Sequence, residues 1–90
     1  MNLYKISRIN EDIKPFTFVS AVVCAESEQE ARRIHPRGCE IKNWWLDDYW
    51  SNFLDGWDWA KSLENVEVEF LGVASVLIKK GVIVASFNAG

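Results

Sequence analysis

The sequence has little of what enzymes and metal sites most often use: one histidine and two cysteines among its 90 residues. A cysteine nucleophile needs a base beside it, and a zinc site needs three or four ligands at regular spacing. His35 stands alone, while Cys24 and Cys39 form no CxxC pattern. We therefore expect no catalytic residue, no bound metal and no cofactor.

Long apolar runs are also missing. No stretch approaches the roughly 20 apolar residues that a membrane-spanning helix requires. The first ten residues alternate apolar and polar side chains, unlike the continuous apolar centre of a secretory signal. Two cysteines are too few for the disulfide framework of a small secreted protein. The sequence therefore predicts a cytoplasmic protein that makes no membrane contact.

Basic residues are absent from the middle of the chain. Residues 43–60 contain four aspartates and neither lysine nor arginine, although the net charge of the whole chain is only -3. An acidic protein repels the phosphate backbone, which removes the main source of non-specific nucleic-acid affinity. The charge therefore disfavours direct binding to nucleic acid.

What is present is the composition of an ordinary globular chain, with 49% hydrophobic and 26% charged residues. At this length we expect one domain, residues 1–90. Alternating patterns predict strands over residues 3–9, 16–25, 66–72 and 82–87. The second and fourth are apolar at both alternating sets of positions, which is typical of strands in the centre of a sheet.

Two helices are predicted between the second and third strands. Ser27 and Glu30 form a capping box that begins a short helix, with Ala31 and His35 on its inner face and Pro36 near its end. Within residues 44–57, the large apolar side chains from Leu46 to Trp57 then lie at i, i+3, i+4, i+7, i+8 and i+11, the spacing of an amphipathic helix.

These elements predict a two-layer α+β fold. An antiparallel sheet of about four strands, covered on one face by one or two helices in the order β-β-α-α-β-β, would bury the apolar stripes. Residues 73–80 allow two interpretations, an extension of the third strand or a short turn of helix.

Two blocks of sequence carry a resemblance to a known family. AESEQEARRIHP at residues 25–36 and SFNAG at residues 86–90 are similar to an AESEEEAR-IHP-like block and a terminal SFNAG shared by small uncharacterised proteins of bacteriophages and prophages. The resemblance spans nearly the whole chain. It implies a phage-type accessory protein in the cytoplasm of a host cell, and it implies no particular activity.

The acidic-aromatic segment, residues 44–59, is the first candidate binding site. Rigid aromatic side chains bordered by carboxylates are typical of protein-binding hot spots that attract a basic partner. The same aromatic side chains could instead form the lid of the core, or the interface of a homodimer. The candidate protein-binding residues are Trp44, Trp45, Asp47, Asp48, Tyr49, Asp55, Asp58 and Trp59.

A basic cluster, composed of Arg32, Arg33, His35 and Arg37, is the second candidate. Arginine side chains match the geometry of phosphate, so the cluster could bind a nucleotide. Solvated side chains at a helix end are the simpler interpretation. The sequence therefore leads to two hypotheses. The first is a non-enzymatic protein that binds and modulates a host protein with a basic surface, with counter-defence inhibition as a role that fits. The second is an oligomer that sequesters a nucleotide.

Overall fold

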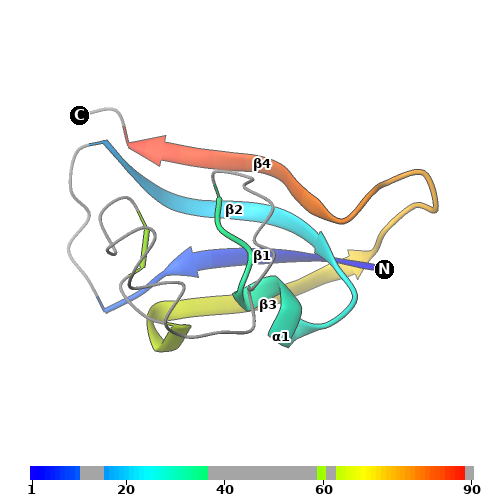
Figure 1. Ribbon diagram of the computed structural model, residues 1–90, viewed down its shortest axis with the longest axis horizontal. Helices are drawn as coiled ribbons and strands as arrows, with labels where there is room; N and C mark the ends of the chain where they lie inside the picture. The colour runs from blue at the N-terminus through cyan, green and yellow to red at the C-terminus, as the bar shows by residue number, and fades with distance from the viewer. Residues whose placement is uncertain (11–15, 37–58, 61–62, 89–90) are drawn as a thin grey trace.

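The computed structural model describes residues 1–10, 16–36, 59–60 and 63–88 (Figure 1). In chain order, the elements are β1 (Asn2–Arg8), β2 (Thr17–Ala25), helix α1 (Glu28–Arg32), the 3-10 turn η1 (Leu63–Asn65), β3 (Val66–Val73) and β4 (Gly81–Asn88). All four predicted strands are confirmed, with ends that differ by at most one residue.

The strands form one antiparallel sheet with the order β3-β1-β2-β4. β1 and β2 are therefore central, and β3 and β4 are the two edges. The prediction that the second strand is central is confirmed, but the same prediction for the last strand is wrong. β4 is apolar at both sets of positions without being buried on both faces, because Ile83 and Val84 stay exposed.

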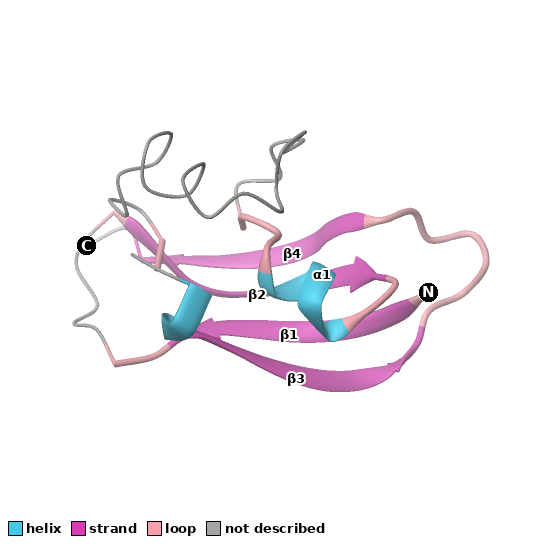
Figure 2. Ribbon diagram, turned by 60° about the horizontal axis from the view of Figure 1, so that its bottom comes forward, coloured by secondary structure: helices cyan, strands magenta, loops and turns pink. Residues whose placement is uncertain are grey.

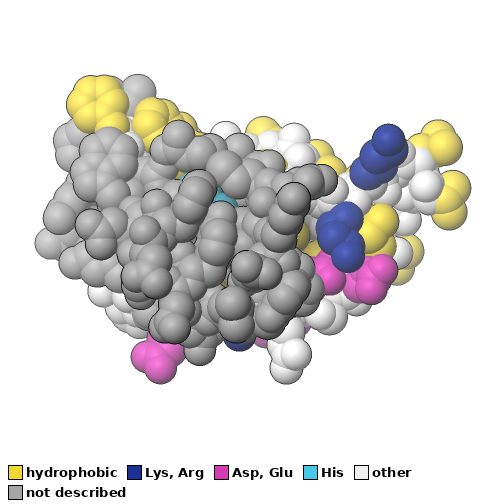
Figure 3. Space-filling model, viewed as in Figure 1, with side chains coloured by type: hydrophobic (Ala, Val, Ile, Leu, Met, Phe, Trp, Pro, Cys, Tyr) yellow, Lys and Arg dark blue, Asp and Glu magenta, His cyan; other side chains and the backbone are white. Residues whose placement is uncertain are grey.

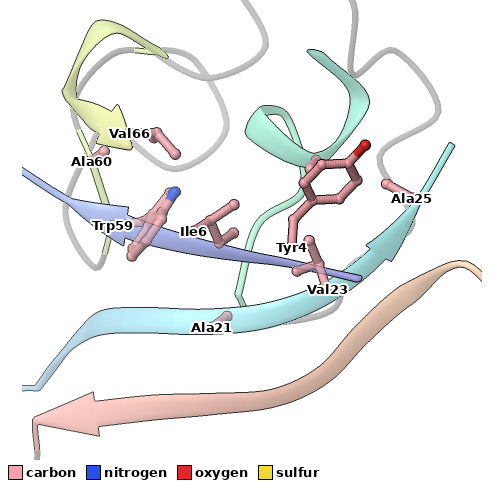
Figure 4. Close-up of a cluster of buried hydrophobic side chains, with 9 residues drawn as sticks. Tyr4, Ile6, Ala21, Val23, Ala25, Trp59, Ala60 and Val66 are labelled. Atoms are coloured by element: carbon pink, nitrogen blue, oxygen red, sulfur yellow. The ribbon is translucent and has the colours of Figure 1, made fainter. Parts of the chain in front are cut away.

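The core lies on one face of the sheet. Tyr4 and Ile6 of β1 are paired with Val23 and Ala21 of β2, and all four side chains are buried. Figure 4 shows Trp59 beside Ile6 in this cluster. Burial of apolar surface on this face supplies the main favourable free energy of folding.

Helix α1 packs on the same face of the sheet (Figure 2) through Ala31, which is fully buried. The Glu30 amide donates a 3.1 Å hydrogen bond to Ser27 Oγ, as the capping box predicts. The Glu30 carboxylate, however, accepts from the amide of Glu26 at 3.1 Å, one residue before the amide that the capping box predicts. The helix is also shorter than expected, since Arg33 already caps its C-terminus.

The opposite face of the sheet is polar over β1 and β3. Lys5 lies directly across from Glu69, and Ser7 from Glu67. Lys5 and both glutamates are exposed. This alternation of a buried and a solvated face is common in antiparallel sheets.

The described part of the chain is thus mostly β-sheet, and α1 is the only α-helix within it. The helix predicted over residues 44–57 lies outside the described residues, so the second layer of an α+β fold stays a prediction. No helix in the described ranges is long and apolar enough to cross a membrane.

Candidate functional site

The connection from β3 to β4, residues 74–80, projects beyond the end of the sheet near the N-terminus (Figure 1). At its start, the Ala74 amide donates a 2.9 Å hydrogen bond to the carbonyl oxygen of Met1. Further on, the Ile78 amide donates to the Ser75 carbonyl at 3.0 Å, and the Leu77 amide to Ser75 Oγ at 3.3 Å. These bonds close a β-turn over residues 75–78 with Val76 and Leu77 at its two central positions.

Both central side chains point into solvent. Val76 is 99% exposed, Leu77 is 87% exposed, and Val73 at the end of β3 is 79% exposed. We call Val73, Val76 and Leu77 the apolar turn. Figure 3 shows hydrophobic and basic side chains gathered at this end of the molecule.

The two central residues do not help the turn to form. Serine suits the first position of such a turn, because its hydroxyl accepts from a nearby backbone amide. The central positions of such turns favour proline, glycine, asparagine or aspartate, whose backbones adopt turn conformations readily. Val76 and Leu77 are not among these residue types. They also bury almost nothing within the chain. Folding therefore gives no reason for aliphatic side chains at these positions.

An ion pair holds the end of the connection to helix α1. Lys80 Nζ lies 3.1 Å from one carboxylate oxygen of Glu30 and 3.2 Å from the other. The hydrogen bond to Glu30 raises the pKa of Lys80 above its ordinary value, against a small opposing effect of desolvation. Lys79, the preceding residue, is exposed. The apolar turn is thus presented between a backbone contact to Met1 and a basic pair of residues.

Neither interpretation of residues 73–80 from the sequence describes this segment. β3 ends at Val73, and residues 74–80 form a turn-containing connection instead of more strand or a helix. Ser75 and Gly81 were the available signals of a turn, and Gly81 has a φ of 133° that favours glycine. The apolar residues between them hid the turn, because apolar runs usually indicate buried regular structure.

Most of the acidic-aromatic candidates lie outside the described residues: Trp44, Trp45, Asp47, Asp48, Tyr49, Asp55 and Asp58. Trp59 is the exception, and its side chain is 0% exposed. Its ring centroid lies 6.5 Å from that of His35, and its backbone oxygen accepts from Arg8 Nη1 at 3.5 Å. The prediction that Trp59 contacts a partner at the surface is therefore wrong, because the side chain belongs to the core.

The basic cluster does not converge on one site among the described residues. Arg32 Nη1 donates to the carbonyl oxygens of Leu63 and Val66, and Nη2 lies 3.3 Å from a Glu28 carboxylate oxygen. Arg32 therefore ties α1 to η1 and β3.

His35 is buried on the core face, with an edge-to-face contact to Phe18 at 5.9 Å between centroids. The side chain is not exposed at the surface, and ligand binding by His35 stays a prediction. Arg33 is half-buried at the C-cap of α1, and Arg37 lies outside the described residues.

Cysteine thiols and groups of metal-binding side chains are the remaining candidates for a chemical role. Cys24 is a fully buried free thiol on β2, as its apolar sequence context predicts. Within the described ranges, no three histidine, cysteine or acidic side chains are grouped so that they could hold a metal ion. Cys39 lies outside these ranges.

No protein-family model, no curated protein and no solved structure matches this chain. A functional proposal therefore depends on the geometry described above and on the sequence.

Proposed function

We propose that this chain is a non-enzymatic binding protein that docks onto another protein through its apolar turn. The observation that carries the proposal is the nearly complete exposure of Val76 and Leu77 at the centre of a hydrogen-bonded turn. Fully burying a valine or leucine side chain contributes about 1.5–3 kcal/mol, so two such anchors in a pocket of a partner would supply much of a specific affinity.

The charges near the turn favour a protein over a lipid surface. Stable attachment to a membrane surface takes a larger apolar face or several basic residues. Here Lys80 is already paired with Glu30, and the whole chain carries a net charge of -3, which anionic lipids repel. An apolar pocket with an acidic rim near Lys79 is the complementary surface that we propose.

The resemblance to phage and prophage proteins supports a host protein as the partner, and the host cytoplasm as the place of binding. Inhibition of a host defence protein is the biological role that this class suggests. The acidic-aromatic residues from Trp44 to Asp58 would add a second contact to a basic part of the same partner. The nucleotide-binding alternative receives no support from the positions of Arg32 and His35.

Site-specific crosslinking tests the proposal. A photo-reactive amino acid at position 77 should yield a discrete adduct in host cells, whereas the same group at exposed Glu67 on β3 should not. With the purified partner, the double variant Val76→Ser and Leu77→Ser should weaken binding by about tenfold or more, because truncated anchors commonly cost over 1 kcal/mol.

Two outcomes would contradict the proposal: unchanged affinity in the double variant, or crosslinking of position 77 to lipid in anionic vesicles instead of to protein. The variant Trp45→Ala with Asp48→Lys tests the second contact separately. If it alone abolishes binding, the acidic-aromatic segment is the binding site, and the apolar turn is not.

A further inference from the structure

The two edges of the sheet are protected very differently. β3 carries Glu67 and Glu69, both exposed. Charges of this kind hinder an edge strand from pairing with another chain. β4 contains neither a charged residue nor a proline in its eight residues. Among the described strands, it is therefore the edge without such protection, and we call it the open edge.

Exposed apolar side chains flank the open edge on both faces. Val84 lies across from Val22 on the solvated face and is 59% exposed. Phe87 lies across from Phe18, with an edge-to-face contact of 4.9 Å, and is still 47% exposed on the core side. Phe16, next to the C-terminal end of β4, is exposed as well. In Figure 3, hydrophobic side chains are visible over this end of the strand.

The geometry points to a second copy of the chain as the occupant: we propose that β4 pairs antiparallel with β4 of that copy across a two-fold axis. Backbone donors and acceptors along an exposed edge form a ready template for another β-strand. In a two-fold antiparallel pair, a residue close to the axis faces its own counterpart in the other copy and must tolerate its own kind there. The pairing would join two four-stranded sheets into one continuous sheet of eight strands.

Charge decides which edge can pair with itself. Each copy has a net charge of -3, yet β4 brings no charge into the contact. The same arrangement at β3 would place glutamates from two copies against each other, and like charges across an interface are strongly unfavourable.

The pairing of β4 with β2 indicates which part of β4 could accept another strand. Ser86, Ala85 and Val84 pair with consecutive residues of β2, between two shifts of register. We therefore expect pairing with a second copy to centre on these three residues. The bulge at Ile83, which has no partner in β2, marks one end of the pairing region.

Measurement of molar mass in solution tests the dimer. Wild-type protein should show twice the 10.4 kDa of one chain at micromolar concentration, and dissociate on dilution. Val84→Lys should weaken the dimer by about 100-fold or more, because it brings two like charges close to the two-fold axis. The matched control, Leu71→Lys on the opposite edge strand β3, should leave the dimer intact, since this side chain is also exposed.

Hydrogen exchange locates the contact. Amides of residues 82–87 should gain protection as protein concentration rises, while those of β3 should not. Should Val84→Lys fail to fold, judged by circular dichroism, Ile83→Lys at the bulge places the charge at the same edge. This contact uses residues other than the apolar turn, so loss of dimer and loss of partner binding are separate readouts.

Three results would overturn the inference. The first is a mass of 10.4 kDa for the wild type at every concentration. The second is a dimer that Val84→Lys and Ile83→Lys both leave unchanged. The third is protection of β4 only when a different protein is added.

Discussion

At the scale of single residues, Arg32 shows how a charged side chain is used inside this fold. Its guanidinium reaches from α1 to the carbonyl oxygens of Leu63, the first residue of η1, and of Val66, the first residue of β3. The planar fork of arginine can serve both oxygens and a carboxylate at once. The side chain therefore connects two parts of the chain that are far apart in sequence.

Replacing Arg32 by alanine should lower the free energy of unfolding by about 1–2 kcal/mol. The value lies in the range for hydrogen bonds from a charged donor, reduced because the side chain is partly in water. Urea denaturation measures the change. The control, Glu28→Gln, removes only an exposed ion pair and should cost less than about 0.5 kcal/mol. If both variants cost the same, the carbonyl contacts contribute nothing.

At the scale of elements, the strands and the start of α1 could be predicted because their signals are local. Alternation along 3–9 and 66–72 indicates a strand with one wet face, and Ser27 with Glu30 indicates a helix start. Strand order is not local, since it depends on pairing between distant residues. An apolar strand such as β4 can therefore be an edge, and its sequence alone does not show this.

The sequence pattern does not predict the apolar turn for a related reason. Hydrophobic periodicity treats an apolar residue as buried, so Val76 and Leu77 were assigned to regular structure. Trp59 shows the opposite error: it falls outside the apolar stripe of residues 44–57 and was therefore placed at the surface. Whether a side chain is covered depends on what packs against it, which the spacing of residues does not reveal.

The contact between the β3–β4 connection and α1 has a pH dependence with a definite sign. Because Glu30 raises the pKa of Lys80, the folded state binds that proton more tightly than the unfolded state. The stabilisation is complete below the ordinary pKa of 10.5 and is lost as pH rises through the raised value. Since Lys80 is exposed, we expect only a small change in overall stability.

An NMR titration of the Lys80 side chain measures this pKa directly. Lys80 should lose its proton at higher pH in the wild type than in the variant Glu30→Gln, which keeps the shape of the side chain and removes its charge. Gln29→Glu, which adds a carboxylate at the neighbouring exposed position, serves as a control for general charge. Equal pKa values in the wild type and in Glu30→Gln would show that the ion pair does not form in solution.

At the scale of the whole molecule, the core is thin. Ninety residues bury only about 60% of the surface of the unfolded chain, and the buried cluster lies on one face of a single sheet. Trp59 is the largest fully buried side chain among the described residues. A large share of the core therefore depends on one residue that comes from a connecting segment and not from the sheet.

Trp59→Ala should consequently destabilise the whole protein far more than any surface change. Truncating a buried tryptophan costs about 3–5 kcal/mol, whereas a chain of this size has a total stability of roughly 5–13 kcal/mol. We expect the variant to be partly unfolded at 37 °C, with a clear fall in the denaturation midpoint. Val76→Ala is the matched control, because that side chain is 99% exposed and should leave the midpoint unchanged. A loss below about 1 kcal/mol in Trp59→Ala would return Trp59 to the surface, and with it to the binding residues that the sequence first suggested.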